Sequence, residues 1–189
     1  LAALLGSWFW RGSIRPAQIG LFALAGYVGM QALLMQQAQQ VGEQYAADRR
    51  LEGASVHVLP QPLSPFNWKV LVQQEETYHM ALVNLRRERA PEPVPEDAGL
   101  LRRLSAAYLP PAHARWERIE KFGAGQTAEL ARQAWEQVQF AAYRRFAEYP
   151  ALWSLQDDAD GICAWFVDLR FTASLPDGTV RTPFRYGLC

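Results

Sequence analysis

A chain of 189 residues with 19 basic and 19 acidic side chains has room for one ordinary domain, or for a small domain with a membrane segment. The formal net charge is zero, so no basic excess points to nucleic acid, and we expect none as a partner. Half of the residues are hydrophobic and seven are tryptophans, which excludes a disordered chain and is enough for a folded core.

The N-terminal part of the chain is apolar. Residues 17 to 35, AQIGLFALAGYVGMQALLM, contain no charged side chain. As a helix that rises about 1.5 Å per residue, this run nearly matches a hydrocarbon core of about 30 Å, which predicts a transmembrane helix. Glycines at 20, 26 and 29 would let a neighbouring helix approach closely. The alternative is a buried helix of a soluble protein, because the run is short and contains Gln18 and Gln31.

The residues before this run, LAALLGSWFW, look like the end of a second membrane helix. Trp8 and Trp10 lie where aromatic side chains gather at a membrane interface. We therefore expect residues 1–50 to form one transmembrane helix or a helical hairpin, with a helical extension. The chain begins at Leu1 with no basic stretch ahead of the apolar run, so we expect a piece of a longer protein and no signal peptide.

Basic residues beside the span give its expected orientation. The loop RGSIRP at 11–16 contains two arginines and no acid, which by the positive-inside rule places this loop in the cytoplasm. The domain that follows the span is then extracytoplasmic. Arg49 and Arg50 follow the helix and favour the opposite orientation, so the prediction depends on the short loop.

Three prolines separate the helical segment from the first predicted strand. Residues 36–50 are polar and lack proline, so the membrane helix is expected to continue into water and to end at Gly53. Pro60, Pro62 and Pro65 disfavour helix and hold the backbone near polyproline II. Residues 51–67 are therefore predicted to form a stiff strut between the membrane and a soluble domain over 68–189.

The soluble domain begins and ends with strand patterns. Residues 68–73 and 77–85 are two β-rich runs separated by an acidic pair, which predicts a hairpin. Residues 162–171 and 179–186 flank LPDG at 175–178, where proline presets a turn and glycine accepts positive φ. We expect a small antiparallel sheet of about four strands, one hairpin from each end.

Helical sequence lies between the two hairpins. Residues 127–149 place apolar side chains at helical spacing, and Pro150 ends the pattern. A shorter helix is expected at 111–122. The predicted fold class is α+β, with an N-terminal transmembrane helix or hairpin followed by a small antiparallel sheet packed with helices. The apolar stripe of the longer helix consists of Leu130, Ala131, Ala134, Trp135, Val138, Ala141, Ala142 and Phe146.

Potential metal ligands are few. Cys163 and Cys189 fit neither a metal cluster nor a disulfide framework, and we expect two unlinked thiols. His57, His79 and His113 do not have the spacing of a metal site and are expected to be surface or hydrogen-bonded side chains. The sequence therefore predicts no metal ligand and no cofactor in this chain, and it assigns no catalytic residue.

One charged pair lies in an otherwise apolar strand pattern. Asp168 and Arg170 are two residues apart and share one face of a strand, where isolated charges would be costly to bury. They form either a structural ion pair, with Arg170 also binding backbone carbonyls, or the polar floor of a pocket in which the arginine grips a phosphate or carboxylate. With Trp68 they are our candidates for a substrate-facing or domain-facing pocket.

The order of motifs resembles one known family. Membrane helices precede the proline strut, which ends in Asn67-Trp68; a hairpin follows, then a helix reaching FAEYP at 146–150, then VDLRF at 167–171. From about residue 17 onward, this order is similar to the C-terminal half of the bacterial inner-membrane proteins called YbcI/YdjM-like membrane-bound metal-dependent hydrolases.

The resemblance implies a location, partners and an activity. The chain would lie in the bacterial inner membrane and contact the lipid bilayer and its own N-terminal membrane bundle. In that family a divalent metal is attributed to an H-R-x-x-T-H type motif among the early membrane helices. This chain has no such motif, so no ligand carries over to any of its residues. In the whole protein, a metal-activated water would attack a substrate held at the membrane surface.

Two functions remain open from the sequence. The first is the C-terminal portion of a membrane-bound metal-dependent hydrolase that lacks the N-terminal histidine motif. The second is a non-catalytic, membrane-anchored binding or assembly module whose sheet docks a partner or the protein's own membrane bundle. The residues define neither a substrate nor an oligomeric state.

Overall fold

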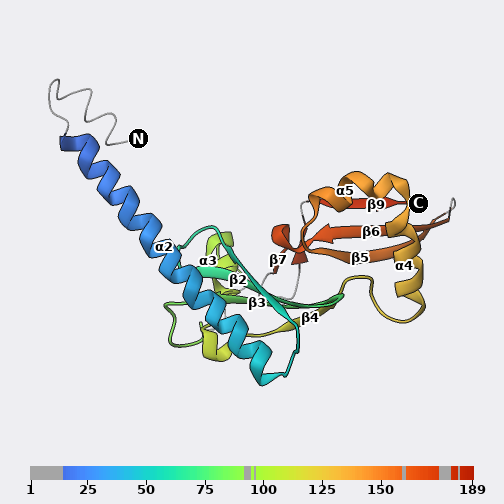
Figure 1. Ribbon diagram of the computed structural model, residues 1–189, viewed down its shortest axis with the longest axis horizontal. Helices are drawn as coiled ribbons and strands as arrows, with labels where there is room; N and C mark the ends of the chain where they lie inside the picture. The colour runs from blue at the N-terminus through green and yellow to red at the C-terminus, as the bar shows by residue number, and fades with distance from the viewer. Residues whose placement is uncertain (1–14, 92–94, 96, 159–160, 175–179, 183) are drawn as a thin grey trace.

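The computed structural model describes residues 15–91, 95, 97–158, 161–174, 180–182 and 184–189 (Figure 1). It contains a long N-terminal helix, two larger antiparallel sheets, a small two-stranded sheet and short helices, so the predicted α+β class is confirmed. The helices are α2 (Arg15–Asp48), α3 (Leu100–Ala106), α4 (Gln126–Glu136) and α5 (Ala141–Phe146), and the 3₁₀ turns are η1 (Pro111–His113), η2 (Val138–Phe140) and η3 (Leu169–Phe171). The strands are β1 (Ser55–Pro60), β2 (Asn67–Gln74), β3 (Thr77–Asn84), β4 (Glu117–Glu120), β5 (Pro150–Asp158), β6 (Gly161–Asp168), β7 (Ala173–Ser174), β8 (Val180–Arg181) and β9 (Arg185–Leu188).

Helix α2 has two halves in different surroundings. It is long and apolar enough to cross a membrane, and its first half extends away from the rest of the molecule, with Phe22 76% exposed (Figure 1). The second half packs on a sheet, where Leu34 and Ala38 are buried. The predicted helix and its extension to Asp48 are confirmed, and most side chains of 36–48 are exposed, but one face of the extension packs on the sheet. One face of this half meets the sheet, and Tyr45 stacks on Trp116 with ring centroids 3.8 Å apart.

Strands β1 to β4 form an antiparallel sheet, sheet A, in the order β1-β2-β3-β4. Alternating side chains of β2 point to opposite faces, and both faces are covered. The face toward α2 forms the helix-side core. This core comprises Leu34, Ala38, Trp68, Val70, Ala81 and Val83.

The expected proline strut is largely part of sheet A. Residues 55–60 form β1, which pairs with β2 so that Pro60 lies opposite Trp68. Proline is tolerated here because it ends an edge strand, where its missing N–H interrupts no ladder. Pro62 and Pro65 lie in the connection between β1 and β2. The prolines therefore shape a turn inside the sheet instead of spacing the domain from the membrane.

A second sheet, sheet B, has the order β5-β6-β9 and packs against sheet A. Residues of both sheets form the inter-sheet core between them, and α4 and α5 cover the other face of sheet B (Figure 1). The molecule thus has four layers, α2, sheet A, sheet B and the α4–α5 pair. The inter-sheet core comprises Leu71, Tyr78, Met80, Tyr149, Ala151, Val167 and Leu169.

The helix expected at 127–149 is broken. Gln137 has φ −60° and ψ 147°, which ends α4 and leads into η2 and α5. The break turns Phe140 and Tyr143 into the core against Phe166, whereas Val138 of the predicted stripe is 78% exposed. The spacing of apolar residues fits either one continuous helix or two shorter helices with a break at Gln137. Packing of Phe140 and Tyr143 on sheet B favours the broken arrangement. The helix expected at 111–122 is also wrong, because this segment contains η1 and strand β4, which pairs with β3.

The C-terminal strands differ from a single hairpin. The predicted turn at 175–178 lies outside the described residues, and the short strands β7 and β8 that flank it pair with each other. The main pairings are β5 with β6 and β6 with β9. Strand β5 did not stand out from the sequence because it directly follows helical residues.

The expectation of two unlinked thiols is wrong. Cys163 and Cys189 form a disulfide with an S–S distance of 2.10 Å. Strand β6 pairs with β9 so that Ala164 lies opposite Leu188. The next position along this antiparallel register brings the two cysteines face to face. The bond thus depends on a strand pairing that the spacing of the cysteines does not reveal.

Candidate functional site

A buried lysine joins the two sheets. Lys69 is the third residue of β2 and is 1% exposed. Its Nζ donates to the carbonyl oxygens of Leu169 (2.5 Å) and Thr172 (2.6 Å) and to the hydroxyl of Thr172 (3.2 Å). Burial lowers the pKa of Lys69 to about 8, although the negative charge of Asp168 opposes the shift. The sequence signal for this residue is one lysine within the apolar run WKVLV.

Asp168 is the last residue of β6, and both oxygens of its carboxylate accept hydrogen bonds. Its Oδ1 accepts the backbone N–H of Arg170 (3.0 Å), and its Oδ2 accepts the backbone N–H of Glu148 (3.1 Å). The guanidinium of Arg170 donates two more bonds to Oδ2, from Nε at 2.9 Å and from Nη2 at 2.6 Å. With both oxygens held by donors of its own chain, this carboxylate is suited to fixing the backbone and not to moving protons.

Arg170 has further partners. Its Nη2 donates to the carbonyl oxygen of Phe146 (2.7 Å), and its Nη1 lies 3.3 Å from a carboxylate oxygen of Glu148. Hydrogen bonding to Asp168 raises the pKa of Arg170, so the guanidinium stays charged. The ion pair with Asp168 and the contact with a backbone carbonyl are what the interpretation of a structural ion pair predicts. A role as the floor of a pocket stays a prediction.

Trp68 lies apart from this pair. Its ring is buried in the helix-side core, and its Nε1 donates to the carbonyl oxygen of Pro65 (3.1 Å). Lys69 is the next residue and points to the other face of sheet A, toward Asp168. The structure therefore brings Asp168 and Arg170 together, places Lys69 beside them, and puts Trp68 on the opposite side of the sheet.

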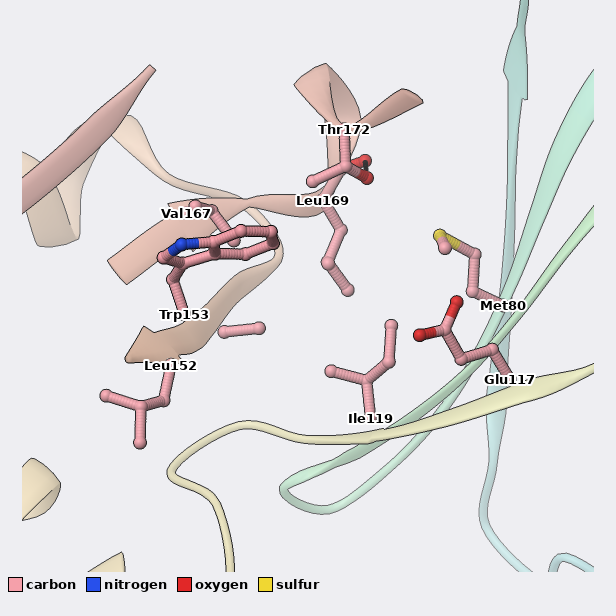
Figure 2. Close-up of a pocket in the computed structure, with 9 residues that line it drawn as sticks. Met80, Glu117, Ile119, Leu152, Trp153, Val167, Leu169 and Thr172 are labelled. Carbon is pink, nitrogen blue, oxygen red and sulfur yellow. Dashed lines mark hydrogen bonds between the residues drawn. The ribbon is translucent and has the colours of Figure 1, made fainter. Parts of the chain in front are cut away.

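A cavity of about 210 Å³ lies between sheets A and B. Its walls are apolar except at Glu117 and Thr172, and Figure 2 shows the Glu117 carboxylate beside Met80 and Ile119, across the cavity from Trp153. Ligand pockets are usually larger, about 300 to 1,000 Å³, so this one suits a short chain or a single side chain. The nine lining residues are Met80, Glu117, Ile119, Ala151, Leu152, Trp153, Val167, Leu169 and Thr172.

An irregularity of β5 directs Trp153 to this cavity. The register of β5 against β6 shifts between Leu152 and Ser154, and such bulges re-aim side chains. As a result, consecutive residues Leu152 and Trp153 both line the cavity, although a regular strand would point them to opposite faces. The guanidinium of Arg185 lies 5.9 Å from the centre of the Trp153 ring.

Glu117 is the charged group of the cavity. It lies on the short strand β4, opposite Met80 of β3. Within the part of the chain that the structure describes, its carboxylate has neither a hydrogen bond nor an ion pair, whereas Glu120 on the same strand pairs with Arg118 at 2.6 Å. Glu117 is exposed, so water solvates its carboxylate, which presents a negative charge at the rim of the cavity. The sequence does not single out this residue, because the pattern around it predicts a helix and not a strand.

The histidines lie at separate places. His79 Nδ1 is 3.0 Å from the hydroxyl of Tyr45, and burial with two nearby arginines lowers the pKa of His79. His57 Nε2 is 3.0 Å from the hydroxyl of Ser55. Among the described residues, no three or more histidine, cysteine, aspartate or glutamate side chains gather as a metal site would require. His113 is exposed, so the expectation of surface or hydrogen-bonded histidines is confirmed for all three.

Comparisons of the chain with known protein families, with curated proteins and with solved structures found no match. The resemblance to the metal-dependent hydrolases therefore stays a prediction from sequence motifs. The motif residues Asn67, Trp68 and Asp168 are all buried, and each makes the hydrogen bonds of a structural position.

Proposed function

We propose that this protein is a membrane-anchored binding module that holds a small ligand group between two sheets. The observation that carries the proposal is the continuity of α2, whose exposed apolar half leads without interruption into a half buried on sheet A. A helix shared by the span and the core fixes the binding domain close to the bilayer.

The disulfide supports the predicted extracytoplasmic side. Disulfides persist in oxidising compartments and are rare in the cytosol. The bond between Cys163 and Cys189 joins β6 to the C-terminal end of β9, so it stabilises sheet B only where thiols are oxidised. This agrees with the orientation that the arginines of the 11–16 loop predict.

The chemistry of the cavity defines the ligand class. Apolar walls bind hydrocarbon, and the exposed carboxylate of Glu117 at the rim attracts a cation. An alkylammonium group fits both features, with its chain in the cavity and its charge at Glu117. The lysine side chain of a partner is one source of this group, and a small amine is another.

Titration with octylammonium tests the site. The protein in detergent or nanodiscs should bind octylammonium, and octanoate should bind at least tenfold more weakly, because its charge is repelled by Glu117. Glu117→Gln should weaken octylammonium binding about tenfold or more, and Ile119→Phe should block it by filling the cavity. Glu129→Gln on α4 is the matched control and should have no effect. Equal binding of the two ligands, or binding that survives Ile119→Phe, would reject the cavity as the site.

The motif resemblance favours a second candidate, the metal-dependent hydrolase of the bacterial inner membrane. In this function the domain would lie beside a metal site built from other residues, and the cavity would accept part of the substrate. Elemental analysis separates the two candidates when the protein is purified with any natural sequence that precedes Leu1. Stoichiometric zinc or manganese supports the hydrolase, whereas a metal-free, folded protein that binds octylammonium supports the binding module.

A further inference from the structure

The domain begins on α2 before the uncharged run ends. Met30 and Leu34 already pack in or against the helix-side core, although residues 17–35 carry no charge. Thirteen residue steps separate positions 17 and 30, about 20 Å of helix, whereas a hydrocarbon core is about 30 Å thick. If α2 spans the bilayer, as the proposed function requires, sheet A must lie directly against the membrane surface.

An aromatic patch lies on the part of the molecule that this placement brings to the bilayer. We define the patch as Phe146, Phe171 and Phe184, which are 54%, 37% and 61% exposed. The rings of Phe146 and Phe171 stack with centroids 6.0 Å apart, and those of Phe171 and Phe184 meet edge to face at 5.3 Å. Phe171 thus contacts both of the other rings, and a contiguous exposed aromatic patch of this kind is a candidate site of interaction.

The position of the patch in the fold favours the membrane as its partner. Phe146 ends α5, Phe171 ends η3 just before β7, and Phe184 precedes β9. In Figure 1, α5 lies along the upper edge of sheet B, β7 lies lower, near the left ends of β5 and β6, and the exposed half of α2 extends to the upper left. Helix α5, which ends at Phe146, and the exposed half of α2 thus lie toward the same side in this view, although more than 100 residues of sequence separate them.

Basic side chains accompany the aromatic rings. The guanidinium of Arg170 lies 5.3 Å from the ring centre of Phe146 and 5.2 Å from that of Phe171. Arg145, next to Phe146 on α5, is exposed. Arg170 is held by Asp168 and Glu148, so Arg145 is the basic side chain that can meet an anionic headgroup, beside rings suited to the boundary of the acyl chains.

We propose that the aromatic patch is a second membrane contact, which docks the domain on an anionic bilayer surface. This inference rests on the proposed membrane anchoring by α2. Because the anchor holds the patch close to the bilayer, its effective concentration there is high and a weak contact is enough. A protein partner would have to reach the same narrow space. The domain would therefore lie on the membrane at two points and not swing from one helix.

Depth-dependent quenching tests the contact in the full chain. Both native cysteines are in the disulfide, so Phe184→Cys and, separately, Phe146→Cys give single sites for an environment-sensitive fluorophore. In nanodiscs of phosphatidylcholine with about one third phosphatidylglycerol, both labels should be quenched by nitroxide lipids and shielded from iodide. Labels at Glu52→Cys, after the far end of α2, and at Leu130→Cys, an exposed apolar position on α4, should show the reverse.

The outcomes separate the two proposals. Labels at 146 and 184 that iodide reaches as readily as the label at 52, in protein that copurifies with nanodiscs, would overturn the second contact and leave the anchor in place. Protein that stays outside the nanodiscs would overturn the anchoring itself. Lipid quenching at 130 equal to that at 184 would show that the label drives insertion, which also overturns the second contact.

Discussion

The two faces of strand β2 are held by different forces. Toward α2, sheet A presents apolar side chains, and small residues of the helix, Ala38 and Gly42, let the backbone approach closely. Toward sheet B, the same strand buries the charged amine of Lys69, which ends on carbonyl oxygens near Asp168. The first face depends on shape and the second on complete hydrogen bonding, so different changes should break them.

The largest effect is expected at the polar face. Asp168→Ala removes the acceptor of four hydrogen bonds and leaves Arg170 and Lys69 without their buried negative charge. Breaking a buried ion pair from one side typically costs about 3 to 5 kcal/mol, and we expect a loss of this size in the free energy of unfolding. Chemical denaturation in detergent measures it. Glu148→Ala, at the exposed end of the same network, is the control and should cost less than about 1 kcal/mol.

The face of sheet A toward α2 should be destabilised by a larger side chain placed between the helix and the sheet. A Cβ at position 42 would collide with Val56 and would lie 2.9 Å from Val70 Cγ1, so Gly42→Val must push α2 away from sheet A. Overpacking of this kind costs up to about 3 kcal/mol, and we expect faster hydrogen exchange in β1 and β2. At Gly26 no atom lies within 4 Å of an added Cβ, so Gly26→Val should leave both measurements unchanged. Equal effects at the two glycines would show that α2 does not pack as described.

The smallest expected effect is a pH dependence of stability that comes from the buried Lys69 on the polar face of β2. Lys69 has a folded-state pKa of about 8, below its ordinary value of 10.5, so between these values the unfolded chain binds more protons. The free energy of unfolding should therefore rise with pH in this window, by about 2 kcal/mol from about pH 7.5 to 9.5. Lys69→Met should abolish this rise, whereas Lys121→Met should keep it. A wild-type stability that is flat or falls with pH over this range contradicts the buried amine.

Local patterns predicted the parts of the fold that local forces determine. The uncharged run at 17–35 gave α2, and the alternation after Trp68 gave the β2–β3 hairpin. Strand β1 was not predicted because it contains Pro60. Proline fits here only because β1 is an edge strand, which the sequence does not reveal. Between residues 127 and 149 the periodicity fits one long helix, but the break at Gln137 places Phe140 in the core.

The candidate site was harder to predict because it depends on contacts between distant segments. Asp168 and Arg170 stood out as charges in an apolar strand, and the structure places them together. Lys69 takes its role from carbonyl oxygens about a hundred positions away. Trp153 reaches the cavity through a bulge, and Glu117 through a short strand that begins after a 3₁₀ turn. None of these contacts produces a residue spacing that can be recognised in the sequence.

The unbroken helix α2 has a mechanical consequence. A membrane-spanning helix whose length does not match the bilayer adapts by tilting or by locally changing the bilayer thickness, and this response changes with lipid composition. If α2 spans a membrane, the sheets must rotate with the helix, because one face of residues 34–48 packs on sheet A. A thinner membrane would then lower one side of the domain and raise the other, so the lipid environment would set how far the mouth of the cavity stands above the surface.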